Sequence, residues 1–133
     1  MPEELRIPQY VKDETLTPLH QNYKETADLE AELPGLDVLY MTRIQKERFF
    51  NEEDYLRLKG CYELDEKLLQ VAPPTMPVLH PLPRIDEIST DVDNDPRAAY
   101  FDQVHNGVYI RMAIILALLG IPDPLTGKTV LDH

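Results

Sequence analysis

Hydrophobic residues fall into short continuous runs that alternate with acidic or amphipathic segments. The clearest run spans 37–41 and follows a Pro-Gly turn, and a second spans 76–80 after paired prolines. Runs of this length, bounded by turn residues, are typical of buried β-strands. A third run at 15–19 contains Pro18, which limits it to a sheet edge or to a non-strand. The pattern predicts two buried strands and one weaker candidate.

Helical patterns separate the runs, over 23–33, 51–58, 65–71 and 96–119. The last is the strongest, because Asp95 is a good N-cap, Pro96 suits the first helical position and Gly120 ends the pattern. Its second half is apolar on nearly every side, so we expect it to be buried between other elements.

Strands that alternate with helices indicate an α/β fold with a parallel sheet. The strands are continuously apolar, as expected where helices cover both faces and make three layers. Ligands of such sheets bind beyond the carboxyl ends of the strands. The segments that follow residues 41 and 79 are therefore the candidate site.

The segment after the first strand concentrates positive charge. Arg43, Lys46 and Arg48 lie within six residues of a chain that has 13 Lys and Arg in all. In an extended loop Arg43 and Gln45 point the same way, and an arginine fork matches a carboxylate or phosphate. Glu47 could hold that fork in position. The segment is either an anion site or a solvated charge run, and the residues alone leave both open.

The loop after the second strand reads His80-Pro81-Leu82-Pro83. Its two prolines stiffen the turn and remove two backbone donors. The carbonyls of Pro81 and Leu82 are then free to face a ligand amine, and an X-Pro bond can be cis. The alternative is a rigid turn in which His80 has only a structural role.

Composition narrows the function classes. The chain has 133 residues, a net charge of -11 and 43% hydrophobic residues, which favours one folded domain. The acidic balance argues against nucleic acid and against a polybasic membrane contact. No apolar run reaches the ~20 residues of a membrane span. The single cysteine, Cys61, excludes an internal disulfide and fits a reducing cytoplasm.

A metal loop is the weaker interpretation of one acidic segment. Asp91, Asp93 and Asp95 alternate as in a calcium loop, but Pro96 and Asp102 stand where that loop needs Gly and Glu. We expect a helix start there, with Asp91 and Asp95 as cap and dipole partners.

Three blocks closely resemble aspartate carbamoyltransferase, in the C-terminal aspartate-binding domain of its catalytic chain. They are DVLYMTRIQKERF at 37–49, HPLPRIDEI at 80–88 and DNDPRAAYFDQVHNGVYIRMA at 93–113, in the family's order and spacing. The resemblance implies a Rossmann-like parallel sheet that is incomplete at its N-terminal strands. It also implies a partial aspartate-binding domain over 1–121, followed by a tail over 122–133.

The resemblance implies a reaction as well. The amino group of L-aspartate attacks carbamoyl phosphate, and phosphate leaves a tetrahedral intermediate to give N-carbamoyl-L-aspartate for pyrimidine synthesis. Catalysis would be mainly orientation and charge stabilisation, with no metal or organic cofactor. The full enzyme would be a cytoplasmic homotrimer.

Roles carry over by motif. Arg43 matches the arginine that grips an aspartate carboxylate, Gln45 lines the aspartate site, and Glu47 orients the arginine. The carbonyls of Pro81 and Leu82 match those that bind the reacting amino groups.

Three supporting roles are implied too. Leu82 and Pro83 match a cis peptide, and Arg48 resembles a residue that bridges to the carbamoyl-phosphate domain. Tyr55 and Asp86 fall where the family has an open-state contact.

The sequence departs from the family's pattern in the motifs that serve the other substrate, carbamoyl phosphate. The family's carbamoyl-phosphate loop, Ser-Thr-Arg-Thr-Arg, is absent, as is its catalytic histidine. We therefore expect a C-terminal piece that is inactive alone, with at most three parallel strands and a long helix that lacks part of its packing surface. The alternatives are a non-catalytic module that docks on a full-length carbamoyltransferase and a free-standing binder of dicarboxylates.

Overall fold

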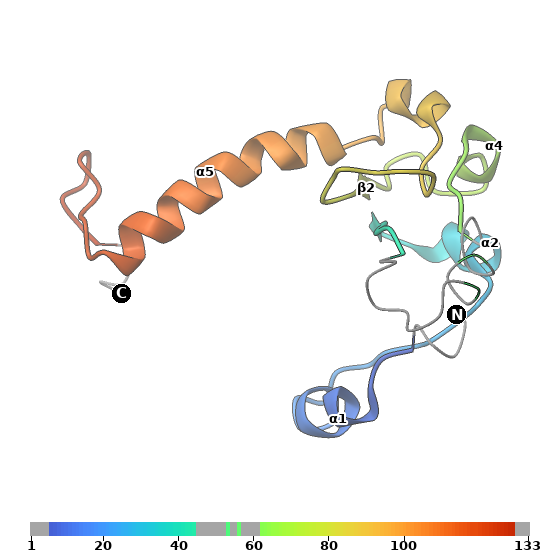
Figure 1. The fold of residues 1–133 in the computed structure, drawn as a ribbon, viewed down its shortest axis with the longest axis horizontal. Coiled ribbons are helices and arrows are strands. Elements are labelled where there is room, and N and C mark those ends of the chain that lie inside the picture. The colour runs from blue at the N-terminus through green and yellow to red at the C-terminus, as the bar shows by residue number, and fades with distance from the viewer. Residues whose placement is uncertain (1–5, 45–52, 54–55, 57–61, 130–133) are drawn as a thin grey trace.

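A computed structural model describes residues 6–44, 53, 56 and 62–129. Strands β1 (Leu39–Tyr40) and β2 (Val78–Leu79) form a two-stranded parallel sheet in which Leu39 pairs with Val78 and Tyr40 with Leu79 (Figure 1). Both strands lie inside the two apolar runs, so their positions are confirmed with shorter strands. The expected burial of both faces is not met in β1, where Tyr40 is 53% exposed. On the other side of β2, Val78 pairs in parallel with Ala98.

The other described elements are helical. They are α1 (Gln9–Val11), the π-helical turn η2 (Lys12–Leu16), α2 (Leu29–Glu32), the 3₁₀ turn η3 (Leu33–Gly35), α4 (Glu66–Leu69), the 3₁₀ turn η5 (Thr90–Asn94) and α5 (Tyr100–Leu118). Two of them begin at an aspartate cap. Asp28 accepts a hydrogen bond from Ala31 N at 3.0 Å, and Asp65 accepts one from Leu68 N at 2.6 Å. The helix expected over 65–71 is thus confirmed in shorter form.

The core forms where the strands, α4, η3 and the first turn of α5 meet. Its buried apolar residues are Leu33, Leu39, Met41, Leu64, Leu69, Ala72, Met76, Val78, Ile88, Val92 and Tyr100. Of the polar and charged side chains in the described residues, His80 and Glu87 are buried beside them. Burial of such groups requires partners, which directs attention to the loop between them.

Two expectations for the N-terminal third are settled by the structure. Of the two alternatives for 15–19, the non-strand is observed, because residues 12–16 close a π-helical turn in which Thr17 N donates to the Lys12 carbonyl at 2.9 Å. The helix expected over 23–33 begins only at Leu29. Upstream, Glu25 accepts bonds from Ile7 N at 2.9 Å and Lys12 Nζ at 2.6 Å, which tie that segment to the N-terminal turn.

Most of the helix expected over 51–58 lies outside the described residues.

Helix α5 starts four residues later than expected. The Asp95 carboxylate does not cap it, because Asp95 binds the Arg97 guanidinium at 2.9 and 2.7 Å and Arg97 N at 2.8 Å. Asp91 lies within η5 and so does not precede the long helix as a cap. At the other end the stop is confirmed: Gly120 takes the left-handed backbone, with φ of 63°.

Most of α5 is uncovered. Tyr100 is its one buried residue, and beyond the first turn the helix extends away from the other described elements (Figure 1). Val108 is 50% exposed and Leu118 is 80% exposed. The expectation that its second half is buried is wrong for the described residues, whereas the expected missing packing surface is confirmed. No helix in the described part of the chain is long and apolar enough to cross a membrane.

Candidate functional site

The two predicted site segments leave the same edge of the sheet. Met41 N donates to the Leu79 carbonyl at 2.8 Å, so the chain after β1 and the chain after β2 start side by side. Arg43 is half-buried two residues beyond Met41. Parallel strands present their ligands at this carboxyl edge. The structure therefore brings the Arg43 segment and the loop over 80–88 together, as predicted.

Four predicted site residues lie outside the described part of the chain. They are Gln45, Glu47, Arg48 and Tyr55, and Lys46 lies there too. Their roles stay predictions. Asp86, the expected partner of Tyr55, is described and lies half-buried in the loop after β2.

The His80 imidazole is fully enclosed and bonded at both nitrogens. Nδ1 accepts a hydrogen bond from Leu82 N at 2.8 Å, and Nε2 lies 2.7 Å from Glu87 Oε1. A nitrogen that accepts a hydrogen bond carries no hydrogen itself. The proton of the neutral ring is therefore on Nε2, and the ring donates it to the Glu87 carboxylate.

Glu87 ties the far end of the same loop. Its Oε2 accepts from Ile85 N and from Asp86 N, each at 3.2 Å. Burial raises the pKa of Glu87, but hydrogen bonds from backbone N–H groups and from His80 outweigh it and leave the pKa below its ordinary value of 4.5. The carboxylate is thus charged near neutral pH.

The main chain between these anchors has an unusual shape. The Leu82–Pro83 peptide is cis, which confirms that expectation, and Leu82 has φ of 45°. Left-handed backbone is uncommon for a branched residue and costs about 1 kcal/mol or more. The bond from Leu82 N to His80 stabilises that conformation. Within the described residues no donor reaches the carbonyl of Pro81 or Leu82.

A second tie fixes the loop to α5. Arg84 binds Asp93 with both terminal nitrogens and donates to the Tyr100 hydroxyl at 3.1 Å, while that hydroxyl donates to Asp93 at 2.5 Å. Arg84 lowers the pKa of Asp93, and burial together with Asp93 raises the pKa of Tyr100 to about 12. At neutral pH the cluster is therefore one ion pair with a neutral phenol.

Sequence reasoning missed two residues of this site. Glu87 is one, and Gln103 on α5 is the other. Gln103 Oε1 accepts from His80 N at 2.8 Å, and its Nε2 donates to the Tyr40 hydroxyl at 3.1 Å. It thereby joins the ends of both strands. Neither has a distinctive local signal, because Glu87 follows Asp86 and Gln103 follows Asp102, and polar residues in such stretches are usually solvated.

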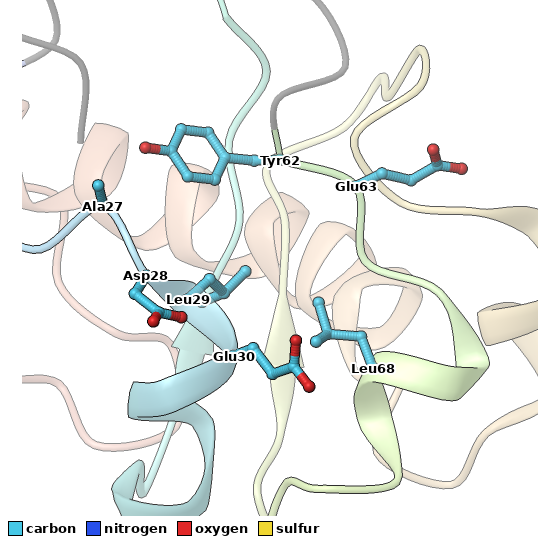
Figure 2. A pocket seen from close by; sticks show the side chains of 7 residues that line it. All are labelled: Ala27, Asp28, Leu29, Glu30, Tyr62, Glu63 and Leu68. Atoms are coloured by element: carbon cyan, nitrogen blue, oxygen red, sulfur yellow. The ribbon is translucent and has the colours of Figure 1, made fainter.

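A shallow hollow lies elsewhere, between the start of α2 and the chain that enters α4. Figure 2 shows its lining side chains, which are Ala27, Asp28, Leu29, Glu30, Tyr62, Glu63 and Leu68. Its charged groups are three carboxylates, one of which already caps α2. The described residues contain no group of three or more His, Cys, Asp or Glu placed to hold a metal ion.

The Glu87 contacts predict an acid-sensitive loop. Because folding lowers this pKa, the charged form adds stability above about pH 4.5, and that contribution is lost as pH falls through the folded pKa. The free energy of unfolding, measured by urea titration from pH 7 to pH 3, should fall less steeply below pH 4.5 in Glu87→Gln than in the wild type. Parallel curves would contradict this. Glu30→Gln, an exposed substitution on α2, is the matched control.

Comparison with known proteins places these features in a family. The family model described as "Aspartate/ornithine carbamoyltransferase, Asp/Orn binding domain" matches residues 2–118. The aspartate carbamoyltransferase catalytic subunit of Bifidobacterium longum subsp. infantis is 56% identical over 133 residues, with 97% of this chain and 42% of that protein covered. The subunit of Lachnoclostridium phytofermentans is 58% identical over 120 residues, covering 90% of this chain and 39% of that protein. The chain therefore spans about two fifths of the length of these curated relatives.

Solved structures agree. The catalytic subunit of M. jannaschii aspartate transcarbamoylase superposes with a TM-score of 0.75 at 39% identity, over 90% of this chain and 38% of that one. The Trypanosoma cruzi enzyme, solved in complex with aspartate and phosphate, also gives 0.75, at 38% identity over 86% of this chain and 39% of that one. The α/β fold with its small parallel sheet is thus the partial Rossmann-like domain that the sequence predicts.

Proposed function

Since the chain belongs to the aspartate/ornithine carbamoyltransferase family, in its Asp/Orn-binding domain, we propose that it forms the aspartate-binding part of an aspartate carbamoyltransferase. That enzyme transfers a carbamoyl group from carbamoyl phosphate to the amino group of L-aspartate, for pyrimidine biosynthesis. The domain would span 1–121 with a tail over 122–133, and the assembled enzyme would be a cytoplasmic homotrimer. The similarity to catalytic subunits over 97% of the chain supports the reaction.

One structural observation carries the site assignment. Arg43 and the loop over 80–88 leave the same edge of the sheet, and that loop presents the carbonyls of Pro81 and Leu82 without a donor among the described residues. An arginine fork holds a carboxylate, and carbonyls accept from an amine. One amino acid carries both groups. Arg43 would grip a carboxylate of aspartate while the two carbonyls orient its amino group toward the carbamoyl carbon.

The remaining roles complete the arrangement. Gln45 would line the aspartate site and Glu47 would orient Arg43. Arg48 would bridge to the carbamoyl-phosphate domain, and Tyr55 with Asp86 would form the open-state contact. Catalysis would rest on holding the amine in position and on stabilising charge as phosphate leaves.

Turnover should require more than these 133 residues, because the sequence contains no Ser-Thr-Arg-Thr-Arg loop for carbamoyl phosphate. We predict that the purified chain forms no carbamoyl aspartate. A chimera in which it replaces the matching 42% of the Bifidobacterium longum subsp. infantis subunit should be active. Carbamoyl aspartate is measured colorimetrically in both. Robust turnover by the chain alone, or an inactive but folded chimera, would contradict the proposal.

The uncovered surface of α5 favours a second candidate function, a non-catalytic module that docks on a full-length carbamoyltransferase. Co-purification of the chain with that full-length subunit, together with an inactive chimera, would select this function.

A further inference from the structure

The loop after β2 contains a buried pair that touches none of the atoms assigned to substrate. His80 and Glu87 are 1% and 5% exposed, and their side chains meet at 2.7 Å. Burying two ionisable groups costs desolvation free energy, which the hydrogen bonds of the pair must offset. The other hydrogen bonds of these two side chains all go to main-chain N–H groups of the same loop, so the pair constrains the conformation of that loop.

The imidazole holds the middle of the loop. Its Nδ1 accepts from Leu82 N at 2.8 Å, and this bond turns the N–H of Leu82 inward while the residue has φ of 45°. The carbonyl of Pro81 belongs to the same peptide unit as that N–H. Because a peptide unit is planar and trans, fixing the N–H direction also fixes the direction of the Pro81 carbonyl.

Glu87 sets the ring. By accepting from Nε2 it keeps the proton on that nitrogen, which leaves Nδ1 as an acceptor. Its second oxygen binds Ile85 N and Asp86 N, so the carboxylate itself cannot turn. On the opposite side, Gln103 accepts from His80 N at 2.8 Å. The ring is thus held in one orientation and one tautomer.

We propose that His80 and Glu87 are positioning residues that aim the Pro81 and Leu82 carbonyls at the substrate amine, by holding the Nε2-protonated imidazole against Leu82 N. Neither residue contacts substrate in this scheme. The role toward substrate rests on the proposed function. The hydrogen bond by which His80 holds Leu82 N, called the hold on Leu82 below, does not.

The hold can be measured in the chain alone. In protein labelled with ¹⁵N, Nδ1 of His80 should resonate as an unprotonated nitrogen and Nε2 as a protonated one, with a scalar coupling between Leu82 N and Nδ1 across the hydrogen bond. Glu87→Gln should weaken or abolish that coupling. A ring protonated on Nδ1 at neutral pH, or a coupling unchanged in Glu87→Gln, would overturn the proposal.

Two substitutions separate positioning from bulk stability in the active chimera. Asparagine at position 80 can place its amide oxygen near the Nδ1 position and still accept from Leu82 N, whereas glutamine reaches toward Glu87 and gives up that acceptor. We expect His80→Gln to lower kcat for carbamoyl transfer about tenfold with little change in the KM for aspartate, and His80→Asn to restore much of that loss. His105→Asn, on the exposed face of α5, is the matched control.

Equal kcat losses in both variants would show a general structural role and overturn the positioning role. If the wild-type chimera is inactive while the coupling to Leu82 is present, the proposed function fails and the hold on Leu82 stands.

Discussion

Replacing Arg43 with alanine should raise the KM for L-aspartate about a hundredfold in the active chimera. Arg43 is the described cation at the carboxyl edge of β1, and the proposed function gives it a carboxylate of the substrate. Losing a charge-assisted pair of this kind costs about 3 kcal/mol, which is about two orders of magnitude in affinity. Calorimetry of the chimera with L-aspartate or succinate measures the same loss without turnover.

Two controls make the result specific. Arg43→Lys keeps the charge but loses the planar fork, so we expect a loss of about tenfold. Arg111→Ala removes the same charge from the exposed surface of α5 and should leave KM unchanged. An unchanged KM in Arg43→Ala would show that Arg43 does not bind aspartate. Equal changes of KM in Arg43→Ala and Arg111→Ala would show that only the net charge of the protein matters.

Replacing Arg97 with alanine should lower the free energy of unfolding by about 3 kcal/mol. Arg97 Nη1 donates to the carbonyls of Leu69, Ala72 and Pro73 at 2.8 to 3.4 Å, and the guanidinium also pairs with Asp95. Its side chain is 13% exposed, so water replaces these bonds poorly. Alanine would leave the Ala72 carbonyl without a donor and would remove the guanidinium from the Leu69 and Pro73 carbonyls and from the Asp95 carboxylate, each of which keeps a backbone N–H donor.

Urea denaturation at pH 7, followed by circular dichroism, measures this change. Arg97→Lys keeps one charge near Asp95 and should lose about half as much, and Arg111→Ala should stay within about 0.5 kcal/mol of the wild type. Arg97 lowers the pKa of Asp95, so the deficit of Arg97→Ala should shrink as the pH falls below the ordinary aspartate value of 3.8. If Arg97→Ala lowered the free energy of unfolding by less than about 1 kcal/mol at pH 7, the stabilising role given to Arg97 would be wrong.

The sheet and the site edge were predictable because their signals are local. The runs at 37–41 and 76–80 are apolar, short and preceded by turn residues, a combination that favours strands. Once both are parallel, the positions of Arg43 and of the loop after β2 follow from chain direction. The cis peptide at Leu82–Pro83 came from the family motif rather than from spacing.

Other features depend on competition that sequence spacing does not resolve. Asp95 has the right chemistry for a helix cap, but Arg97 two residues later binds both of its carboxylate oxygens through Nε and Nη2. Segment 23–27 has a helical pattern, but Glu25 is bound by Lys12 and by the main chain of Ile7. The His80–Glu87 pair joins residues seven apart with no periodic signal. In the first two cases a specific side-chain partner overrides a local helical preference.

The loop over 80–93 is closed by contacts among its own residues and by a bridge to Leu64, whose N donates to the Glu87 carbonyl at 3.0 Å and whose carbonyl accepts from Ser89 N at 2.9 Å. Glu87 returns to His80 and Asp93 to Arg84 over seven and nine positions, and α5 contributes only Tyr100 and Gln103. Opening the rest of α5 therefore breaks none of these bonds. Amide protons of that helix, exposed over most of its length, should exchange with solvent in a low-energy subglobal event while the loop stays protected. We therefore expect two cooperative units of unequal local stability, with the loop over 80–93 in the more stable one.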